Sequence, residues 1–279
     1  MLAGVWVMLL LAWELSYRVI GWRAWIFPAP SHVLDAALAM LNIHTGFGEP
    51  LGGTWPRSAA SGIAPSAWSE VLTSPLLSAL AVSGVRLLVG FAAALVIGLI
   101  VGVLLWRSRF LNALLGPVFL GMQTLPSVCW VPLAVLTLGI GERGVLAVLV
   151  LGSGFSVAIA MRDGLGSVPP IYRAAGTMLG ARGSRLYTSV LLPACMPALA
   201  GALRQGFSFA WRSLLGAELI LMTQRRGMGF LLGAGRDFAD VAQVVAMMAI
   251  MVGVGMLADR CVFAFIERRV KHRFGLLHA

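Results

Sequence analysis

The feature that most constrains the fold is a series of uncharged apolar stretches, each long enough to cross a lipid bilayer. Residues 87–106 and 114–140 contain no charged side chain. A helix needs about 20 apolar residues to cross the hydrocarbon core of a bilayer, and in lipid it satisfies its own backbone hydrogen bonds. Only 11% of the residues are charged, against about 25% in a soluble domain. The sequence therefore predicts an all-α, polytopic membrane protein.

The apolar stretches predict six membrane spans. They cover residues 2–20, 82–106, 114–140, 145–161, 193–222 and 241–266. Residues 1–279 are predicted to form one transmembrane domain, with a first span in 1–26, an external segment with a short helix at 27–81, a five-span core at 82–266 and a basic cytoplasmic tail at 267–279. The first span is interpreted as retained, since Glu14, Tyr17 and Arg18 follow its apolar part in place of a small-residue cleavage site.

Local signals outside the long spans refine this organisation. Ser31 is the predicted N-cap of the short external helix. Glu14 and Arg18 are four residues apart, a spacing that allows an ion pair on one helix face. The Gly- and Pro-rich residues 45–69 and the Gly-rich residues 223–240 are predicted loops.

The distribution of basic residues predicts the orientation. The formal net charge is +10, and the arginines cluster at the ends of apolar stretches. That placement is typical of membrane anchoring and argues against a nucleic-acid partner. If both termini face the cytoplasm, the inner side receives more Arg and Lys side chains than the outer side. The positive-inside rule therefore favours cytoplasmic termini.

The sequence offers no chemistry of its own for ATP or for metals. The three cysteines have no CxxC partner, and the four histidines lie outside the apolar runs, so neither a disulfide framework nor a metal site is indicated. A P-loop needs Gly-Lys-Ser/Thr, whereas the one lysine, Lys271, precedes His272. We therefore predict that the chain is not an enzyme and holds no cofactor. If transport is driven by ATP, the ATPase is a separate chain.

The third predicted span combines three prolines with polar residues. Pro126 lies near the middle of residues 114–140, so this span is predicted to be kinked or broken there. Gln123, Ser127 and Trp130 share one helix face and are candidates for a gate or a transient substrate contact. The alternative is a kinked helix whose core polar groups are hydrogen-bonded. In the second span, Gly98 and Gly102 form a GxxxG pattern that allows close helix approach.

The fifth predicted span carries a polar stripe that includes ionisable residues. Arg204, Ser208, Arg212 and Glu218 fall within one arc of the helix. Charges inside a membrane usually face a bundle interior or an aqueous path. The functional interpretation is the wall of a translocation path that favours anions. The alternative is structural, with Glu218 pairing with an arginine between helices.

The connection at 163–189 carries the most informative motif. It reads VPPIYRAAGTMLGAR at 168–182, followed by VLLP at 190–193, a pattern that predicts a short amphipathic helix, a Gly turn and a Pro-led span. It resembles the EAA loop of binding-protein-dependent importer permeases, with Ala174 at the position of the motif's Glu and Gly176 at that of its second Ala. The resemblance implies an ATPase-coupling loop that contains Tyr172, Arg173, Ala174, Ala175, Gly176, Gly180, Arg182, Arg185, Leu192 and Pro193.

Further segments are similar to the nitrate, taurine and alkanesulfonate permeases of ABC importers. They include FPAPSHVL at 27–34, SGVRLLVGF at 83–91, QTLP at 123–126 and GMG at 227–229. The resemblance implies the type I importer permease fold, a homodimer, a cytoplasmic ATPase dimer that holds ATP and Mg²⁺, an extracytoplasmic substrate-binding protein, and a place in the bacterial inner membrane.

The resemblance also implies a substrate class, a small oxyanion or organosulfonate moved by alternating access. Related permeases import vitamin or pyrimidine precursors, so these remain an alternative. An ATP-independent secondary transporter or channel is a second alternative. Such proteins often have a pair of broken helices, whereas this sequence predicts a single broken span with no partner in the other half of the chain. An integral membrane enzyme is a third, but no His or Cys set at one membrane depth supports it.

Overall fold

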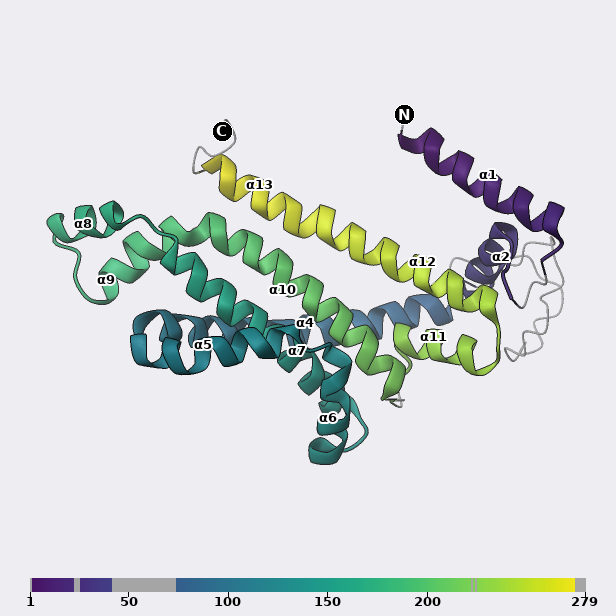
Figure 1. Cartoon of the computed structure of the whole chain (residues 1–279), viewed down its shortest axis with the longest axis horizontal. Helices are drawn as coiled ribbons and strands as arrows, with labels where there is room; N and C mark the ends of the chain where they lie inside the picture. The colour runs from purple at the N-terminus through teal and green to yellow at the C-terminus, as the bar shows by residue number, and fades with distance from the viewer. Residues whose placement is uncertain (1, 23–25, 42–73, 222, 224, 274–279) are drawn as a thin grey trace. The chain divides into compact units, whose positions relative to one another are not determined.

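The computed structural model describes residues 2–22, 26–41, 74–221, 223 and 225–273. In this part of the chain every regular element is helical (Figure 1), as the sequence predicts. The elements are α1 (Leu2–Ile20), α2 (Pro30–Met40), α4 (Pro75–Arg107), α5 (Arg109–Thr124), η1 (Ser127–Cys129), α6 (Trp130–Leu138), α7 (Glu142–Gly166), α8 (Pro170–Met178), α9 (Ser184–Leu186), η2 (Tyr187–Leu191), α10 (Leu192–Ile220), α11 (Met228–Asp237), α12 (Val241–Ala258), η3 (Asp259–Phe263) and α13 (Ala264–Arg273).

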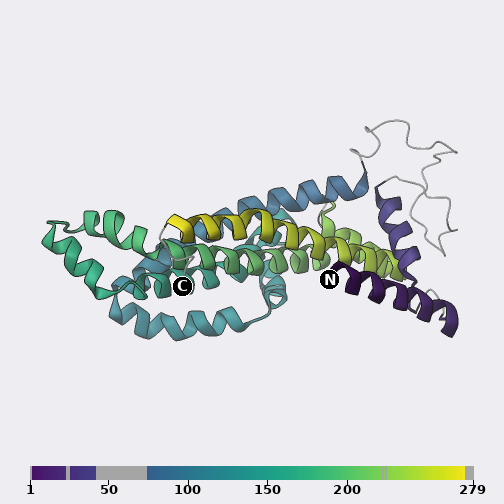
Figure 2. The ribbon, with the colours of Figure 1, turned by 90° about the horizontal axis from the view of Figure 1, so that it is seen from above.

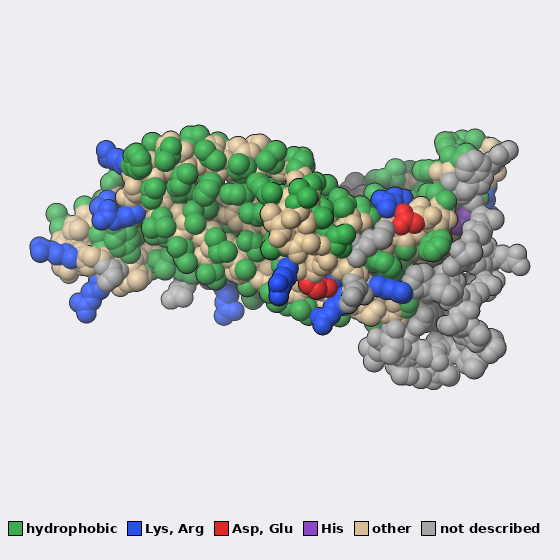
Figure 3. Space-filling view, turned by 90° about the horizontal axis from the view of Figure 1, so that it is seen from below, with side chains coloured by type: hydrophobic (Ala, Val, Ile, Leu, Met, Phe, Trp, Pro, Cys, Tyr) green, Lys and Arg blue, Asp and Glu red, His purple; other side chains and the backbone are tan. Residues whose placement is uncertain are grey.

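Four continuous helical stretches among the described residues are long and apolar enough to cross a membrane. They are Pro75–Arg107, Glu142–Gly166, Tyr187–Ile220 and Val241–Val270. A fifth candidate is the pair Arg109–Thr124 and Ser127–Leu138, bent by 102° at the predicted break. Exposed apolar side chains cover these helices, for example Leu88 and Leu136, and hydrophobic atoms dominate the surface in Figure 3. The chain is thus a polytopic helical membrane protein, and the crossing by α1 stays a prediction.

The second span begins earlier than predicted, and the N-cap of α2 differs from the prediction. Helix α4 starts at Pro75 because Ser74 accepts a hydrogen bond from the backbone of Leu77 at 3.4 Å. The Ser31 N-cap prediction was wrong, because Pro30 occupies the first turn and Ala29 is the N-cap residue. Instead, the Ser31 hydroxyl donates to Glu14 Oε1 at 3.4 Å.

The Gly-rich stretch 223–240 was predicted to be a loop, but it contains helix α11. The composition was misleading because two of its glycines, Gly229 and Gly235, lie within the helix and pack closely on neighbouring residues, so they do not mark turns. The predicted loop at 45–69 lies outside the described residues.

The chain forms two compact units, and each is described separately. The first consists of Met1–Val85 and Glu218–Gly253. In it the predicted Glu14–Arg18 ion pair forms at 2.9 Å on α1. The ring of Tyr17 meets His32 of α2 edge-on, with centroids 5.5 Å apart. Gln243 of α12 donates to the carbonyl of Leu231 in α11 at 3.0 Å. These contacts hold α1 to α2 and α11 to α12.

The second unit consists of Arg86–Ala217 and Val254–Ala279. Within it α7 is the most buried span and lies beside α5, α6 and α10 (Figures 1 and 2). A Cβ atom on Gly98 would lie 2.7 Å from Val157, and one on Gly102 would lie 2.6 Å from Met161. The GxxxG pattern of α4 therefore brings α4 close to α7 within the chain. Rings of Phe91, Phe207 and Phe263 join α4, α10 and η3.

Candidate functional site

Helix α8 forms where the sequence predicts the short amphipathic helix. Pro170 stands in its first turn, where the missing N–H costs no helical hydrogen bond. The helix ends at Met178, and Gly180 follows with a φ of +82°. Gly183 has a φ of +55°. Residues with a Cβ rarely adopt these angles, so the two glycines make the turn that returns the chain toward α10.

Gly176 is the one residue of α8 that is buried. A Cβ atom at this position would lie 2.9 Å from Leu186 Cδ1 and 3.1 Å from Val190 Cγ2. The glycine that departs from the motif's second alanine therefore lets α8 lie directly on the segment that enters α10. Ala174 and Ala175 are exposed, so the position of the motif's Glu is on the free surface of the loop.

The remainder of α8 and its turn present side chains to solvent. Met178 and Leu179 are each 88% exposed, Ile171 is 71% and Tyr172 is 53%. Arg173, Arg182 and Arg185 are exposed as well. A surface apolar patch ringed by arginines is typical of a protein interaction site. We refer to Ile171, Tyr172, Met178 and Leu179 as the α8 patch.

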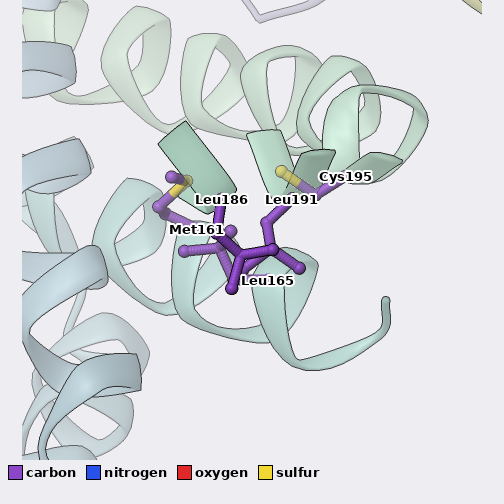
Figure 4. Close-up of a cluster of buried hydrophobic side chains, with 5 residues drawn as sticks. All are labelled: Met161, Leu165, Leu186, Leu191 and Cys195. Carbon is purple, nitrogen blue, oxygen red and sulfur yellow. The ribbon is translucent and has the colours of Figure 1, made fainter. Parts of the chain in front are cut away.

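A buried hydrophobic cluster lies beneath this loop. Figure 4 shows Met161 and Leu165 of α7 in contact with Leu186, Leu191 and Cys195, which belong to α9, η2 and α10. Val190, whose side chain meets Gly176, packs against the same cluster. Interiors packed in this way transmit displacement because they are nearly incompressible. The α8 surface is thus linked through Gly176 to two membrane spans.

The entry into α10 is a π-helical turn, which sequence reasoning missed. In η2 the backbone N–H of Leu192 reaches the carbonyl of Tyr187, five residues back. Leu192 is exposed and Pro193 is half-buried. Pro193 has no N–H to donate, and a π-turn just before it accommodates the loss. The Leu-Pro pair predicted for the coupling loop thus marks the start of the span.

The fifth-span stripe separates into residues with different partners. The guanidinium of Arg204 donates to both oxygens of Asp259 at 2.6 Å and to Glu267 at 3.3 Å. This is an ion-paired cluster between α10 and the final helical stretch. Asp259 and Glu267 were not singled out from the sequence. Each is an acidic side chain near the end of an apolar helix, which was the available signal.

Ser208 and Arg212 are exposed on α10. Their hydrogen bonds stay within the helix, from Ser208 Oγ to the carbonyl of Arg204 at 3.2 Å and from Arg212 Nε to the carbonyl of Ser208 at 3.1 Å. The Arg212 guanidinium also lies 4.8 Å from the centroid of the Phe209 ring. No carboxylate of the described residues forms an ion pair with Arg212, so its charge is open to a solute or another chain.

Glu218 is buried, and it joins three segments of the first unit. Its carboxylate accepts hydrogen bonds from Ser83 Oγ at 2.8 Å and from the backbone N–H of Gly229 at 3.0 Å. Ser83 in turn accepts from the backbone N–H of Met228 at 2.8 Å. The negative charge therefore lies at the amino end of α11, where the helix dipole favours it. Ser83 was missed as a partner because it lies 135 residues away along the chain.

The third-span candidates flank the bend between α5 and α6. Gln123 Oε1 and Trp130 Nε1 are buried polar atoms without a hydrogen-bond partner among the described residues. The Trp130 ring stacks on Phe155 of α7 with centroids 5.8 Å apart. Ser127 is half-buried and borders Gly152 of α7. The structure thus places Ser127 and Trp130 against α7.

A further ion pair joins the first third of α4 to the first residue of α7. Arg86 is 5% exposed, and its Nε donates to Glu142 Oε2 at 2.7 Å. The sequence signal was available, since Arg86 is the last charge before a long uncharged stretch. No group of three His, Cys, Asp or Glu side chains arranged for a metal ion occurs in the part of the chain that the structure describes.

Comparison with known proteins adds a family to this geometry. Residues 94–272 match the family described as "Binding-protein-dependent transport system inner membrane component". The chain is 29% identical to a nitrate import permease protein of Synechocystis over 66% of each chain. It is 29% identical to a taurine transport system permease protein of Escherichia coli, over 64% of this chain and 65% of that protein.

Two other relatives are also named as permease proteins. A putative ABC transporter permease protein of Methanocaldococcus jannaschii is 30% identical over 67% of this chain and 70% of its own length. A bicarbonate transport system permease protein of Synechococcus elongatus is 27% identical over 66% of this chain and 65% of that protein. The chain thus matches about two thirds of the length of these relatives.

Proposed function

This chain belongs to the family of binding-protein-dependent transport system inner membrane components, and from that premise we propose that it is the permease subunit of an ATP-driven importer. In this proposal the chain binds no nucleotide. ATP and Mg²⁺ are held by a separate cytoplasmic ATPase dimer, and a soluble binding protein delivers the solute from outside. Two relatives are named as permease proteins, one for nitrate import and one for taurine transport. These names support a transport function rather than an enzymatic one.

The observation that carries the proposal is the exposed α8 patch on a helix whose buried Gly176 contacts Leu186 and Val190. Met178 and Leu179 are almost fully exposed, although burial of such side chains is favourable by about 1.5–3 kcal/mol each. An ATPase surface that covers the patch would gain that free energy, while Arg173 and Arg182 at its edge would pair with acidic groups. Because Ala174 replaces the motif's Glu, the proposed interface relies on apolar and basic contacts.

The contacts beneath α8 suggest how ATP binding would move the spans. A displacement of α8 would pass from Gly176 to Leu186 and Val190, and from there to the cluster around Met161 and Cys195. That cluster joins α7 to the start of α10. Alternating access would follow if closure of the two ATPases tilts these spans together.

The proposed path lies between two copies of the chain and is lined by α10. Ser208 and Arg212 are exposed on this helix, and a lone arginine there would favour anions. Nitrate, bicarbonate and taurine, named in the relatives, each carry an anionic oxygen group. We therefore propose a small oxyanion or organosulfonate as the solute. Import of a vitamin or pyrimidine precursor, and transport without ATP, are the alternatives.

The proposed location is the bacterial inner membrane, with both termini in the cytoplasm. In that orientation the arginine-rich turn after α8 faces the cytoplasm and α11 faces outward. A single cysteine at position 182, in a variant without the three native cysteines, should react with an impermeant maleimide only in inverted vesicles. A cysteine at position 237 should react in intact cells, and the reverse pattern would contradict the proposed orientation.

Co-purification tests the proposed partner directly. The tagged chain is purified from its native membrane in mild detergent, and the proteins that accompany it are identified by mass spectrometry. We expect a P-loop ATPase with the unaltered chain and its loss with Met178→Asp/Leu179→Asp, because two charges would be buried in the interface. The matched control, Phe238→Asp, alters an exposed apolar residue next to α11 and should retain the ATPase. A chain that purifies without any ATPase, or equal recovery from all variants, would contradict the proposal.

A further inference from the structure

We propose that the break between α5 and α6 is a gate, closed in this structure, whose opening gives Gln123, Trp130 and Ser156 the hydrogen-bond partners that they lack here. The proposal deepens the proposed function and rests on it for the solute path that the gate would control. The residues of the gate all belong to the second unit. The names of the relatives assign no gate to any part of the chain.

Three buried polar atoms near the break have no hydrogen-bond partner among the described residues. They are Gln123 Oε1 near the end of α5, Trp130 Nε1 at the start of α6 and Ser156 Oγ in α7. A kinked helix with hydrogen-bonded core polar groups would have satisfied the first two. An unsatisfied buried polar group destabilises the state that buries it. All three atoms therefore disfavour the closed arrangement relative to one in which water reaches them.

The two arms of the break converge on one ring of α7. Phe119 lies one turn before Gln123 in α5, and its ring meets that of Phe155 with centroids 5.1 Å apart. On the other side of the break the Trp130 ring stacks on Phe155 with centroids 5.8 Å apart. Both arms therefore depend on Phe155 for their position, and a movement of either arm off that ring would uncover the polar atom that it carries.

The residues between the arms rest on glycines and not on interlocking side chains. A Cβ atom on Gly152 of α7 would lie 3.1 Å from Ser127 Cβ, and one on Gly216 of α10 would lie 3.0 Å from Val128 Cγ2. Ser156 is four residues after Gly152 and so lies on the same face of α7. Because neither glycine has a side chain, η1 can slide over α7 and α10 without separating interdigitated side chains.

The backbone at the break supplies the hinge. Leu125 and Pro126 both have a ψ of 131°, which is extended and not helical, and both are exposed. Irregular backbone inside a membrane span is tolerated where it is buried in protein or lines a water-filled cavity. Burial inside this chain does not account for the break, whereas a water-filled path beside it would. Water from such a path would reach the three polar atoms when the arms move.

Thermal unfolding of the full-length chain in detergent, purified together with any bound partners, tests whether these atoms destabilise the closed form. Gln123→Met keeps the length of the side chain and removes the unpartnered oxygen, and Ser156→Ala removes the unpartnered hydroxyl. We expect each to raise the unfolding midpoint by about 2–4 °C. The matched control is Gln243→Met, which should lower the midpoint because the Gln243 amide donates to the carbonyl of Leu231 at 3.0 Å. If bound water already satisfies the break, Gln123→Met and Ser156→Ala would lower the midpoint, and that result would overturn the proposal.

Thiol alkylation measures the opening itself. The Ser156→Cys variant, in a chain whose three native cysteines are replaced by alanine, should react with N-ethylmaleimide only when the gate is open. Addition of Gln123→Met should slow this reaction by at least about fivefold, because the closed form no longer buries an unsatisfied polar group. The control is Val157→Cys, a buried position that faces Gly98 of α4, and it should stay unreactive. A rate unchanged by Gln123→Met, or equal rates at the two positions, would overturn the gate.

The two measurements use the protein without ATP, so their outcome does not depend on importer activity. Addition of ATP to the chain with its co-purified ATPase then tests the link to the proposed function. We expect ATP to change the alkylation rate of the Ser156→Cys variant and to leave the Val157→Cys variant unreactive. An alkylation rate that responds to Gln123→Met but not to ATP would support the gate and contradict the ATP-driven importer.

Discussion

Glu218 shows at the residue scale how a membrane protein accommodates a buried charge. Its carboxylate is 2% exposed and is surrounded by donors, Ser83 Oγ and the backbone N–H of Gly229. Gly227 and Gly229 approach it so closely that a Cβ atom on either would clash with the Glu218 side chain. The residue that the sequence placed on a path-lining stripe thus caps α11 and fixes it to the start of α4. A role in solute contact stays a prediction.

Replacement of Glu218 by alanine should destabilise the protein by about 3 kcal/mol. Ser83 and the first turn of α11 would lose their buried acceptor, and buried donors left unsatisfied are costly. Thermal unfolding of the detergent-purified protein measures the effect. Gly229→Ala should also lower the midpoint, because its Cβ would lie 2.5 Å from Glu218 Cβ and 2.8 Å from the backbone N of Leu219. Gly253→Ala is the control, since no atom lies within 4 Å of its Cβ position, and an equal effect there would contradict this account.

Arg204 is predicted to act mainly through its ion pair with Asp259. Arg204→Asp and Asp259→Arg should each lower the unfolding midpoint by leaving two like charges in contact. The double exchange should recover most of the loss, but not all of it, because Glu267 then faces an aspartate. Unfolding of the four proteins in one detergent gives the coupling between the two positions. A double variant no more stable than either single variant would show that the ion pair with Asp259 is not how Arg204 stabilises the protein.

At the element scale, the sequence predicted the elements whose signals are local. Pro169, Pro170 and Gly180 delimit α8, and Pro126 marks the bend between α5 and α6 as predicted. The π-turns η2 and η3 and the helix α11 were missed. The turn η2 precedes Pro193, and the start of α11 bonds to Ser83, which is distant in sequence. Helical periodicity does not encode such partners, and nothing in the sequence or the structure explains η3.

Gly152 is predicted to set the distance between α7, α10 and the bend before α6. A Cβ atom at this position would lie 3.0 Å from Ser213 Cβ and 3.1 Å from Ser127 Cβ, and would clash with the Ser213 hydroxyl. Gly152→Ala should therefore destabilise the protein by about 1–3 kcal/mol through overpacking. Gly154→Ala in the same helix has open space and should cause no loss. The two midpoints are compared in detergent, and equal values would show that this packing does not limit stability.

At the scale of the whole molecule, composition predicted a polytopic helical membrane protein, because a span of about 20 apolar residues has few stable environments other than a bilayer. The division into a first span and a five-span core stays a prediction. It did not predict which spans touch. Arg204 and Asp259 are 55 residues apart, and Arg86 and Glu142 are 56 apart. Each of these residues lies in or next to an apolar stretch, but the choice of its partner depends on how the helices pack. The family resemblance stated from the motifs is confirmed by the match over residues 94–272.

Uptake into proteoliposomes tests the central claim, that this chain is the permease of an ATP-driven importer. The chain is reconstituted with its co-purified ATPase and its binding protein, and accumulation of nitrate, bicarbonate and taurine is measured with and without ATP on the ATPase side. We expect one of these solutes to accumulate only with ATP, and Met178→Asp/Leu179→Asp to abolish that accumulation while Phe238→Asp preserves it. Solute movement by the chain alone, at the same rate with and without ATP, would contradict the claim.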